Sequence, residues 1–537
     1  MDLAIIGLDG LDPGLFAEWR DDMPVLDELV DSGGYGRLNS TYPPLSSPAW
    51  PSFFTGKQGG KHGVFGFTRD TADHDQVPIN YGDVTGESLW ELLDDQGIAI
   101  GVINVPITYP PSDLEHGFVI AGWPVPNRVQ IGSPDSVVPD LEADIGESYR
   151  VNPFPPNPEV ARMTPEEVAD AIIEGLEHHG RAFRSLARRH DLDVFYGVHM
   201  AIDKASHHLA FDRGQLKRVY EAQDRVLGEM LDEFPEGTDV VVLSDHGHGA
   251  QGDLSFHTNE WLADEGFLQK HEAAAATGDT VRTLKRRLGL TQENAFRAKN
   301  AIGLGDPRSF LPQSVFDFLK EQIPPAGDSS VGFDPDAVDW SETVAFSSMQ
   351  NTVFLNDERF GGPVTAEEAP ALRRELKRKL QAIQFPLDRR DGELMSYVYT
   401  KDEIFDGPHF EEAPDLVFIA DGMRCACLTG PADDVFQDHV WGEHQQEGIL
   451  ATAGPSFADL PEDAPTRDLI DVFPLVCALL DVPAPADIDG VLPEERFDER
   501  RELAYRAAAE TARASAAYDA TESDTVKAQL EDLGYLG

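Results

Sequence analysis

The sequence predicts an α/β fold in which a doubly wound, mostly parallel sheet carries an inserted cap segment. Short apolar, β-branched runs alternate with amphipathic helical patterns along most of the 537 residues. Such alternation is typical of strands joined by crossover helices. The composition is 41% hydrophobic, although 96 acidic residues face only 43 basic ones. That apolar content excludes a disordered acidic protein and predicts a packed core.

Six runs are expected to form strands because each is short, apolar and rich in branched side chains. They cover residues 3–7, 98–105, 194–198, 240–243, 416–420 and 448–453. Crossover helices are expected at 23–30 and 88–96. A further helix is expected to begin after Thr164, because Pro165 and Glu167 complete a capping-box pattern there.

The chain is expected to divide into four parts. From about residue 269 to 339 the pattern becomes an Ala-rich basic helix and then a loop rich in Pro, Gly and Ser, without a strand signal. We interpret this segment as a cap or lid inserted into the core domain. The parts are therefore 1–268 and 340–500 for the core, 269–339 for the cap and 501–537 for a C-terminal helical tail.

The formal net charge of -53 predicts a salt-adapted surface. Self-repulsion of this size destabilises a compact chain unless concentrated salt screens it. The acidic residues are scattered along the whole length, which disfavours a single face for a basic partner. The same charge repels phosphate backbones, so no nucleic-acid-binding surface is expected. We expect the chain to come from a halophilic organism.

Cysteine usage and hydropathy point to a reducing compartment. Cys425, Cys427 and Cys477 are an odd number without paired spacing, so buried, reduced thiols are expected. The sequence opens directly into a strand pattern without a signal segment, and no run approaches about 18 apolar residues. We expect a cytoplasmic protein without a membrane segment, and the sequence does not indicate its oligomeric state.

Acidic residues and histidines follow two of the expected strands. Asp9 comes directly after strand 3–7. Asp203 and His207 come after strand 194–198, and four residues of helix bring both side chains to one face. Because the carboxyl ends of parallel strands meet at one edge of a sheet, these groups are candidates for a shared site. Each of them could instead be an ordinary turn residue or a polar pair.

Two more clusters have the same character. Asp245 and His246 follow strand 240–243 and precede glycines that allow a tight backbone bend. His444 comes shortly before strand 448–453. Carboxylates and imidazoles are both metal ligands, and together they suit zinc, with manganese as the alternative. For His444 alone, a core histidine is an equally valid interpretation.

Ser46 is the candidate nucleophile and lies in the proline-bounded run PPLSSPAW, residues 43–50. The identity and order of this run and of the four clusters resemble the alkaline phosphatase superfamily. The resemblance is to its type I phosphodiesterase/nucleotide pyrophosphatase family, in an archaeal and bacterial uncharacterised subgroup. Residues 104–111 and 468–492 are similar to that subgroup as well. The likeness covers nearly the whole chain outside the cap.

The resemblance implies a two-metal hydrolase of phosphoric esters, either phosphodiesters or phosphomonoesters of small molecules. Ser46 would attack phosphorus and form a covalent phospho-serine. Two cations, about 3.5 to 4 Å apart in such sites, hold the entering and leaving oxygens. One ion would be held by Asp203, His207 and His444, and the other by Asp9, Asp245, His246 and the Ser46 oxygen. Four histidines match no ligand position of the family, namely His208, His248, His257 and His439.

The position that helps to bind phosphate in the family carries a different residue in this chain. Eukaryotic-type members carry Asn after the proline that follows the nucleophile, where this chain has Ala49 and then Trp50. Lys204, or the backbone amides around Ser46 and Ser47, could bind phosphate instead. Trp50 could form an apolar wall of the substrate site or fill the core.

Three other functions remain open from the sequence. Sulfatases of the superfamily carry xPxR after their nucleophile, and Trp50 stands where that Arg belongs. A phosphomutase similar to the cofactor-independent phosphoglycerate mutases would use the cap to close over its substrate. A non-catalytic binding protein could keep the fold, although every expected ligand residue is present.

Overall fold

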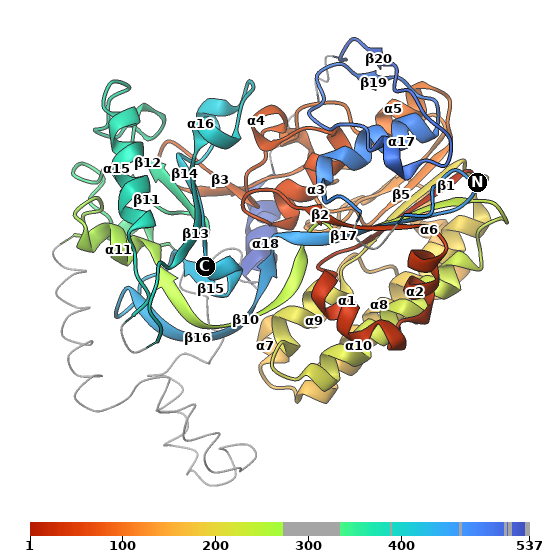
Figure 1. The fold of residues 1–537 in the computed structure, drawn as a ribbon, viewed down its shortest axis with the longest axis horizontal. Helices are drawn as coiled ribbons and strands as arrows, with labels where there is room; N and C mark the ends of the chain where they lie inside the picture. Colours follow the sequence, from red (N-terminus) through yellow and green to blue (C-terminus); the bar gives the residue numbers. More distant parts are fainter. Residues whose placement is uncertain (272–332, 387–388, 461–463, 510–512, 514–517, 532–537) are drawn as a thin grey trace, which may run out of the picture.

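A computed structural model describes residues 1–271, 333–386, 389–460, 464–509, 513 and 518–531. Nearly all of the expected cap, residues 269–339, lies outside these described residues. The described chain forms two lobes side by side, a large one built on a central sheet and a smaller one built on two further sheets (Figure 1).

The central sheet of the large lobe has nine strands and confirms the predicted fold class. Strands β1, β9, β8, β5 and β6 run parallel at its centre, and β17 lies antiparallel between β9 and β2. The order across the sheet is β18 (Arg467–Asp468), β2 (Gly34–Asn39), β17 (Glu447–Ala453), β9 (Asp239–Leu243), β1 (Leu3–Leu8), β8 (Val194–His199), β5 (Ile100–Ile103), β6 (Gly117–Ile120) and β7 (Gly132–Ser133).

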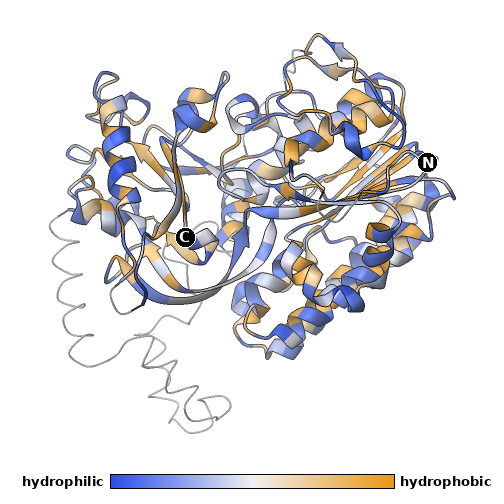
Figure 2. Cartoon of the chain, viewed as in Figure 1, coloured by the Kyte–Doolittle hydropathy of each residue, from blue (hydrophilic) through white to orange (hydrophobic). Residues whose placement is uncertain are grey.

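Helices cover both faces of this sheet, as expected of a doubly wound fold (Figure 1). One face carries α1 (Pro13–Trp19), α2 (Pro24–Asp31), α6 (Val137–Ile145), α8 (Pro165–Arg189), α9 (Ala201–Leu209) and α10 (Arg213–Leu231); the other carries α3 (Ser46–Thr55), α5 (Leu89–Asp95) and α17 (Val472–Leu479). The strands between them are mostly apolar, while hydrophobic and hydrophilic residues alternate along α8 and α10 (Figure 2). The capping box predicted at Thr164 is confirmed, because its side chain accepts from the Glu167 amide.

The small lobe has its own hydrophobic core, which includes Phe256, Phe346, Leu376 and Phe418. One sheet has the order β15 (Cys425–Leu428), β10 (Gly247–His257) and β16 (Phe436–Gln445); the other has the order β11 (Ala345–Phe346), β12 (Thr352–Leu355), β14 (Leu416–Ala420) and β13 (Met395–Thr400). Helices α11 (Thr258–Asp264) and α15 (Ala369–Gln381) complete the lobe. Residues 247–264 and 345–445 contribute to this lobe, and residues from 447 on rejoin the central sheet.

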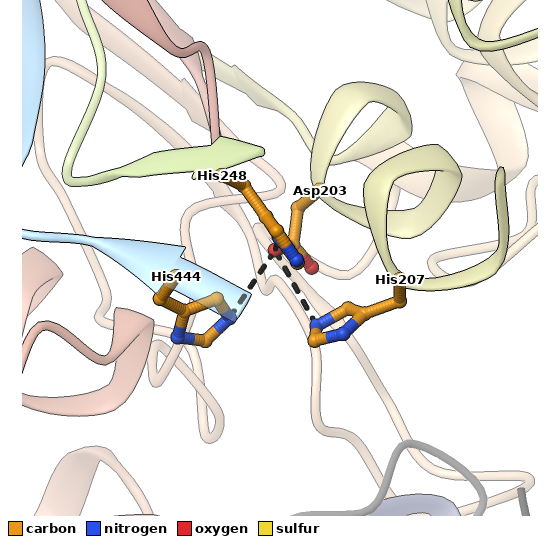
Figure 3. Close-up of side chains that lie close together, drawn as sticks. All are labelled: Asp203, His207, His248 and His444. Carbon is orange, nitrogen blue, oxygen red and sulfur yellow. Dashed lines mark hydrogen bonds and ion pairs between the residues drawn. The ribbon is translucent and has the colours of Figure 1, made fainter. Parts of the chain in front are cut away.

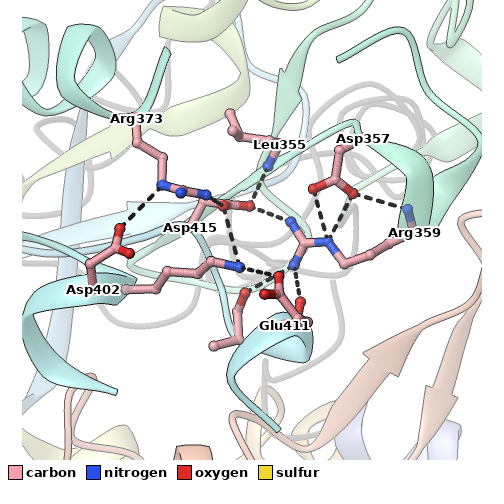
Figure 4. A network of polar contacts seen from close by, with 9 residues as sticks. Leu355, Asp357, Arg359, Arg373, Asp402, Glu411 and Asp415 are labelled. Carbon is pink, nitrogen blue, oxygen red and sulfur yellow. Dashed lines mark hydrogen bonds and ion pairs between the residues drawn. The ribbon is translucent and has the colours of Figure 1, made fainter. Parts of the chain in front are cut away.

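A buried carboxylate ties the strands and the helix of the small lobe together (Figure 4). Asp415 is 0% exposed, accepts from Arg373 Nη1 at 2.9 Å and from the Leu355 amide at 2.9 Å, and also pairs with Arg359. A buried charge is tolerated only when it is paired and hydrogen-bonded in this way. The network gives Asp415 a structural role.

The C-terminal segment packs back on the large lobe. Helix α18 (Ala520–Glu531) buries Val526 and Leu530 in the main core, and β20 (Tyr505–Arg506) pairs with β19 (Ala484–Pro485). The remaining short elements are β3 (Thr68–Asp70), β4 (Gln76–Pro78), α4 (Gly59–His62), α7 (Asn157–Val160) and α16 (Lys401–Ile404). All three cysteines are free and buried, as expected. Among the described helices, none is long and apolar enough to cross a membrane.

Candidate active site

The candidate residues gather at the carboxyl edge of the central sheet. Asp9 follows β1, Asp203 lies on α9 just beyond β8, and Asp245 follows β9. Because β9, β1 and β8 are parallel neighbours, their ends bring these three aspartates together. Backbone hydrogen bonds fix two of the segments, since the Asp9 amide donates to His199 O at 2.9 Å and the Asp203 amide donates to Asp9 O at 3.1 Å.

Asp203, His207, His248 and His444 form the first set of side chains, here called the Asp203 group (Figure 3). Each offers one ligand atom, and these atoms all lie within 4.8 Å of one another. Asp203 Oδ1 is 3.6 Å from His207 Nε2 and 3.5 Å from His444 Nε2. His444 Nδ1 lies 3.0 Å from Pro44 O and donates to it, so that Nε2 is the nitrogen that faces Asp203.

Asp9, Asp245 and His246 form the second set, here called the Asp9 group. His246 Nε2 lies 3.3 Å from Asp245 Oδ2 and 3.7 Å from Asp9 Oδ1. His246 Nδ1 donates to Gly247 O at 3.0 Å, so that Nε2 faces the two carboxylates. The Ser46 hydroxyl joins this group, with Oγ 3.1 Å from His246 Nε2 and 3.4 Å from Asp9 Oδ1.

The two groups adjoin one another. The imidazole rings of His246 and His444 stack with their centroids 4.2 Å apart. Pro44, two residues before Ser46, accepts the hydrogen bond from His444, so the serine loop contacts both groups. The arrangement places one hydroxyl beside two clusters of ligand atoms.

Burial changes the protonation of the site residues. Burial and the neighbouring Asp245 and Asp203 carboxylates raise the pKa of Asp9 well above its usual range. Burial and Asp203 do the same to the pKa of Asp245. The pKa of His444 falls to about 3, because burial, and then the neighbouring His246, disfavour the charged form of its imidazole. A neutral imidazole offers the lone pair that a metal ion requires. A bound cation would stabilise the ionised form of the neighbouring buried carboxylates.

The donor atoms fit divalent metal ions. Atoms about 2.0 to 2.1 Å from a tetrahedral zinc lie about 3.3 Å from one another. The separations of 3.5 and 3.6 Å in the Asp203 group, and of 3.3 Å between His246 and Asp245, approach that value. Asp203 Oδ2 is buried without a hydrogen-bond partner among the described residues. A bound cation would satisfy this oxygen.

Ser46 is the first residue of α3 and is 1% exposed. The first amides of a helix have no partner within the helix, so those of Ser46 and Ser47 are available to an anion. The helix carries no side-chain cap at its N-terminus. This position therefore combines a hydroxyl with backbone donors.

The two residues expected at the substrate lie inside the protein. Lys204 is 3% exposed on α9, with Nζ 5.3 Å from the centroid of the Trp123 ring. Trp50 is 0% exposed, and its indole nitrogen donates to Asp9 Oδ2 at 3.0 Å. Trp50 thus contacts a candidate metal ligand directly, a role that its sequence position did not suggest.

Sequence reasoning missed His248, which the structure places in the Asp203 group. His248 on β10 lies directly opposite His444 on β16, so strand pairing delivers it to the site. Its position two residues after His246 was visible in the sequence, but the pairing was not. His208 and His257 belong to neither group, and the side chain of His439 lies outside the described residues.

Comparison with known proteins identifies the family of this chain. The family model "Type I phosphodiesterase / nucleotide pyrophosphatase" matches residues 3–424. The chain belongs to this family. It is accordingly a phosphoric ester hydrolase, and the predicted resemblance to this family is confirmed. No curated protein matches the chain.

Solved structures of similar fold were also found. Phosphonoacetate hydrolase from Sinorhizobium meliloti 1021, in complex with phosphonoacetate, is 16% identical, with a TM-score of 0.49 over 88% of this chain and 94% of that one. Its complex with phosphonoformate gives a TM-score of 0.48 at the same identity and coverage. Human ectonucleotide pyrophosphatase/phosphodiesterase 5 is 12% identical, with a TM-score of 0.48 over 93% of this chain and 100% of that one.

Proposed function

We propose that this type I phosphodiesterase hydrolyses small phosphoric esters through a covalent phospho-serine on Ser46, with two divalent metal ions. The position of the Ser46 hydroxyl carries the proposal. Its oxygen lies 3.1 Å from His246 Nε2 in the Asp9 group, and its loop accepts from His444 of the Asp203 group. A nucleophile beside two ligand clusters is the arrangement that two-metal phosphoryl transfer requires.

Seven residues would hold the ions. One ion would bind Asp203, His207 and His444, and the other Asp9, Asp245, His246 and the Ser46 oxygen. Bound there, the ions supply Lewis-acid stabilisation of the oxygens that carry charge during transfer. The mixture of imidazole and carboxylate donors favours zinc, with manganese as the alternative.

The reaction has two displacement steps. Ser46 Oγ forms a bond to phosphorus while the ester bond opposite breaks and the alcohol leaves. Water then attacks the phospho-serine, which restores the hydroxyl of Ser46 and releases phosphate or a phosphomonoester. The amides of Ser46 and Ser47 hold a phosphate oxygen at the N-terminal end of α3 in both steps.

Lys204 contributes positive charge near the phosphate. It neighbours Asp203 on α9, it is buried, and its ammonium group lies over the Trp123 ring, with Nζ 5.3 Å from the centroid. Lys204→Met keeps the stem and removes the charge. An increase in KM with unchanged metal content supports phosphate binding by Lys204, whereas unchanged kinetics contradict it.

A panel of chromogenic esters tests the proposed function. Purified protein in concentrated salt is assayed against a phosphodiester, a phosphomonoester and a sulfate ester, with zinc or manganese supplied or chelated. Metal-dependent turnover of either phosphate ester, lost in Asp245→Asn, supports the proposal, and the preferred ester defines the substrate class. Turnover of the sulfate ester alone, or of no ester, contradicts it.

We also propose that the acidic composition is an adaptation to concentrated salt. A net charge of -53 spread over the chain suits the salt-rich cytoplasm of a halophilic organism. A melting temperature that rises with salt concentration would support this proposal.

A further inference from the structure

His248 is a buried histidine of the Asp203 group without an assigned role. It is 0% exposed, and its ring meets those of His207 and His444 edge to face, at centroid distances of 4.2 and 4.8 Å. Its Nδ1 lies 2.8 Å from Asp203 Oδ1 (Figure 3). A buried imidazole in contact with a candidate metal ligand can act either as a further ligand or as the residue that holds that ligand in place.

The distances distinguish these two roles. Two ligand atoms of one tetrahedral zinc lie about 3.3 Å apart. His207 and His444 are 3.6 and 3.5 Å from Asp203 Oδ1, which suits ligands of a common ion. His248 Nδ1 is 2.8 Å from the same oxygen, which is the distance of a hydrogen bond to a charged acceptor.

The surroundings of Nε2, the other ring nitrogen of His248, are consistent with a hydrogen-bond donor at Nδ1. A neutral imidazole that carries its proton on Nδ1 has an acceptor at Nε2. His248 Nε2 is buried and has no hydrogen-bond partner among the described residues, so no contact there requires a proton. The Nδ1–H tautomer therefore fits its surroundings.

We propose that His248 is a positioning residue that donates from Nδ1 to Asp203 Oδ1 and holds this carboxylate toward His207 and His444. The inference rests on the proposed function, because it assumes that the Asp203 group binds a divalent ion. Strand pairing makes the contact rigid, since His248 lies directly opposite His444 on the neighbouring strand. Loss of a residue that hydrogen-bonds to a metal ligand typically lowers metal affinity by about 10- to 100-fold.

Zinc titration of the metal-free, full-length protein against a chromogenic chelator tests this role. His248→Ala removes the donor, whereas His248→Asn keeps an N–H at the same number of bonds from the backbone. His257→Ala is the matched control, because His257 is a buried histidine of the same strand whose contacts are Ser255 and Gly430. Circular dichroism of each metal-free variant verifies the fold.

We expect His248→Ala to weaken the binding of one of the two ions by about 10- to 100-fold. His248→Asn should recover most of this affinity, and His257→Ala should bind like the wild type. Equal affinity of His248→Ala and the wild type would overturn the inference. So would an Asn variant as weak as the Ala variant, because a metal ligand rather than a donor would then have been lost.

The same titration separates the two proposals. A wild-type protein that binds no divalent ion contradicts the proposed function and the inference together. A wild-type protein that binds two ions, with His248→Ala unchanged, contradicts only the role of His248.

Discussion

The indole N–H of Trp50 donates to Asp9 Oδ2 at 3.0 Å, and both side chains are 0% exposed. The other oxygen of Asp9 faces the Ser46 hydroxyl at 3.4 Å. Gly7 makes room for this arrangement, because a Cβ atom there would lie 2.5 Å from the Trp50 ring. Trp50 therefore supports Asp9 from within the core, on the side away from the nucleophile.

Replacing Trp50 with Phe should weaken metal binding without unfolding the protein. Phe keeps most of the apolar contact and removes only the N–H that orients Asp9. We expect about a tenfold loss of affinity for the ion of the Asp9 group, measured by chelator competition. Trp90→Phe is the control, because it removes an indole hydrogen bond away from the site, the part-buried one to Ser112 at 3.2 Å. Equal metal affinity of both variants would contradict the role of Trp50.

Removal of metal should abolish activity and lower the thermal stability. Without an ion, negative charge on the two carboxylates is unfavourable: burial and then the neighbouring Asp245 raise the pKa of Asp9, and burial and then Asp203 raise the pKa of Asp245. An ion that binds only the native state adds stability as its concentration rises. We expect zinc to raise the melting temperature of the chelated wild type and to have a smaller effect on Asp245→Asn. Asp253→Asn, whose side chain is 75% exposed, should respond like the wild type.

Acid should destabilise the fold partly through His179. Its pKa is lowered to about 3, chiefly by burial, whereas an unfolded histidine titrates near 6.5. The unfolded chain therefore binds the proton first, so this contribution to stability is lost as the pH falls from about 6.5 toward 3. His179→Gln can keep the contact to Arg150 O, 3.0 Å from Nε2 in the wild type, without a titrating group.

We expect urea midpoints measured between pH 7.5 and 5.5, in fixed concentrated salt, to fall less steeply for His179→Gln than for the wild type. His116→Gln is the control, because the side chain of His116 is already 44% exposed in the folded protein. A slope for His179→Gln as steep as that of the wild type would mean that His179 does not contribute.

Concentrated salt should stabilise the protein. Exposed ion pairs such as Arg37–Glu447 are worth only about 0 to 1 kcal/mol each, so their loss to screening is small. Repulsion within a chain of net charge -53 is screened at the same time and dominates. We expect the melting temperature to rise between about 0.1 M potassium chloride, where the screening length is about 10 Å, and about 2 M, where it is less than about 3 Å. A falling melting temperature would contradict salt adaptation.

Strands of the large lobe could be predicted because their signals are local. The runs at 3–7, 194–198 and 240–243 are continuously apolar, as expected of strands buried on both faces, and they appear as β1, β8 and β9. Their shared edge also follows from the sequence, because parallel strands end together. Asp9, Asp203 and Asp245 could therefore be predicted to meet without knowledge of any contact.

Features that depend on distant strand pairing could not be predicted in this way. Residues 416–420 form a strand as expected, but β14 pairs with β12 and β13 in the small lobe rather than in the central sheet. His248 reaches the site only through the register of β10 against β16, which shifts at Gly249 and again at Asp253. Nothing in the local sequence of either strand specifies its partner.

Intact-mass analysis after acid quench tests the central claim most directly. Metal-loaded protein is mixed with its preferred phosphate ester, quenched during turnover and digested to locate the modified residue. We expect one phosphoryl group on Ser46 in the wild type and in Ser47→Ala, and none in Ser46→Ala, which should lose at least ~10³-fold in kcat. Turnover that persists in Ser46→Ala, or a phosphoryl group on another residue, would contradict the assignment of Ser46 as the nucleophile.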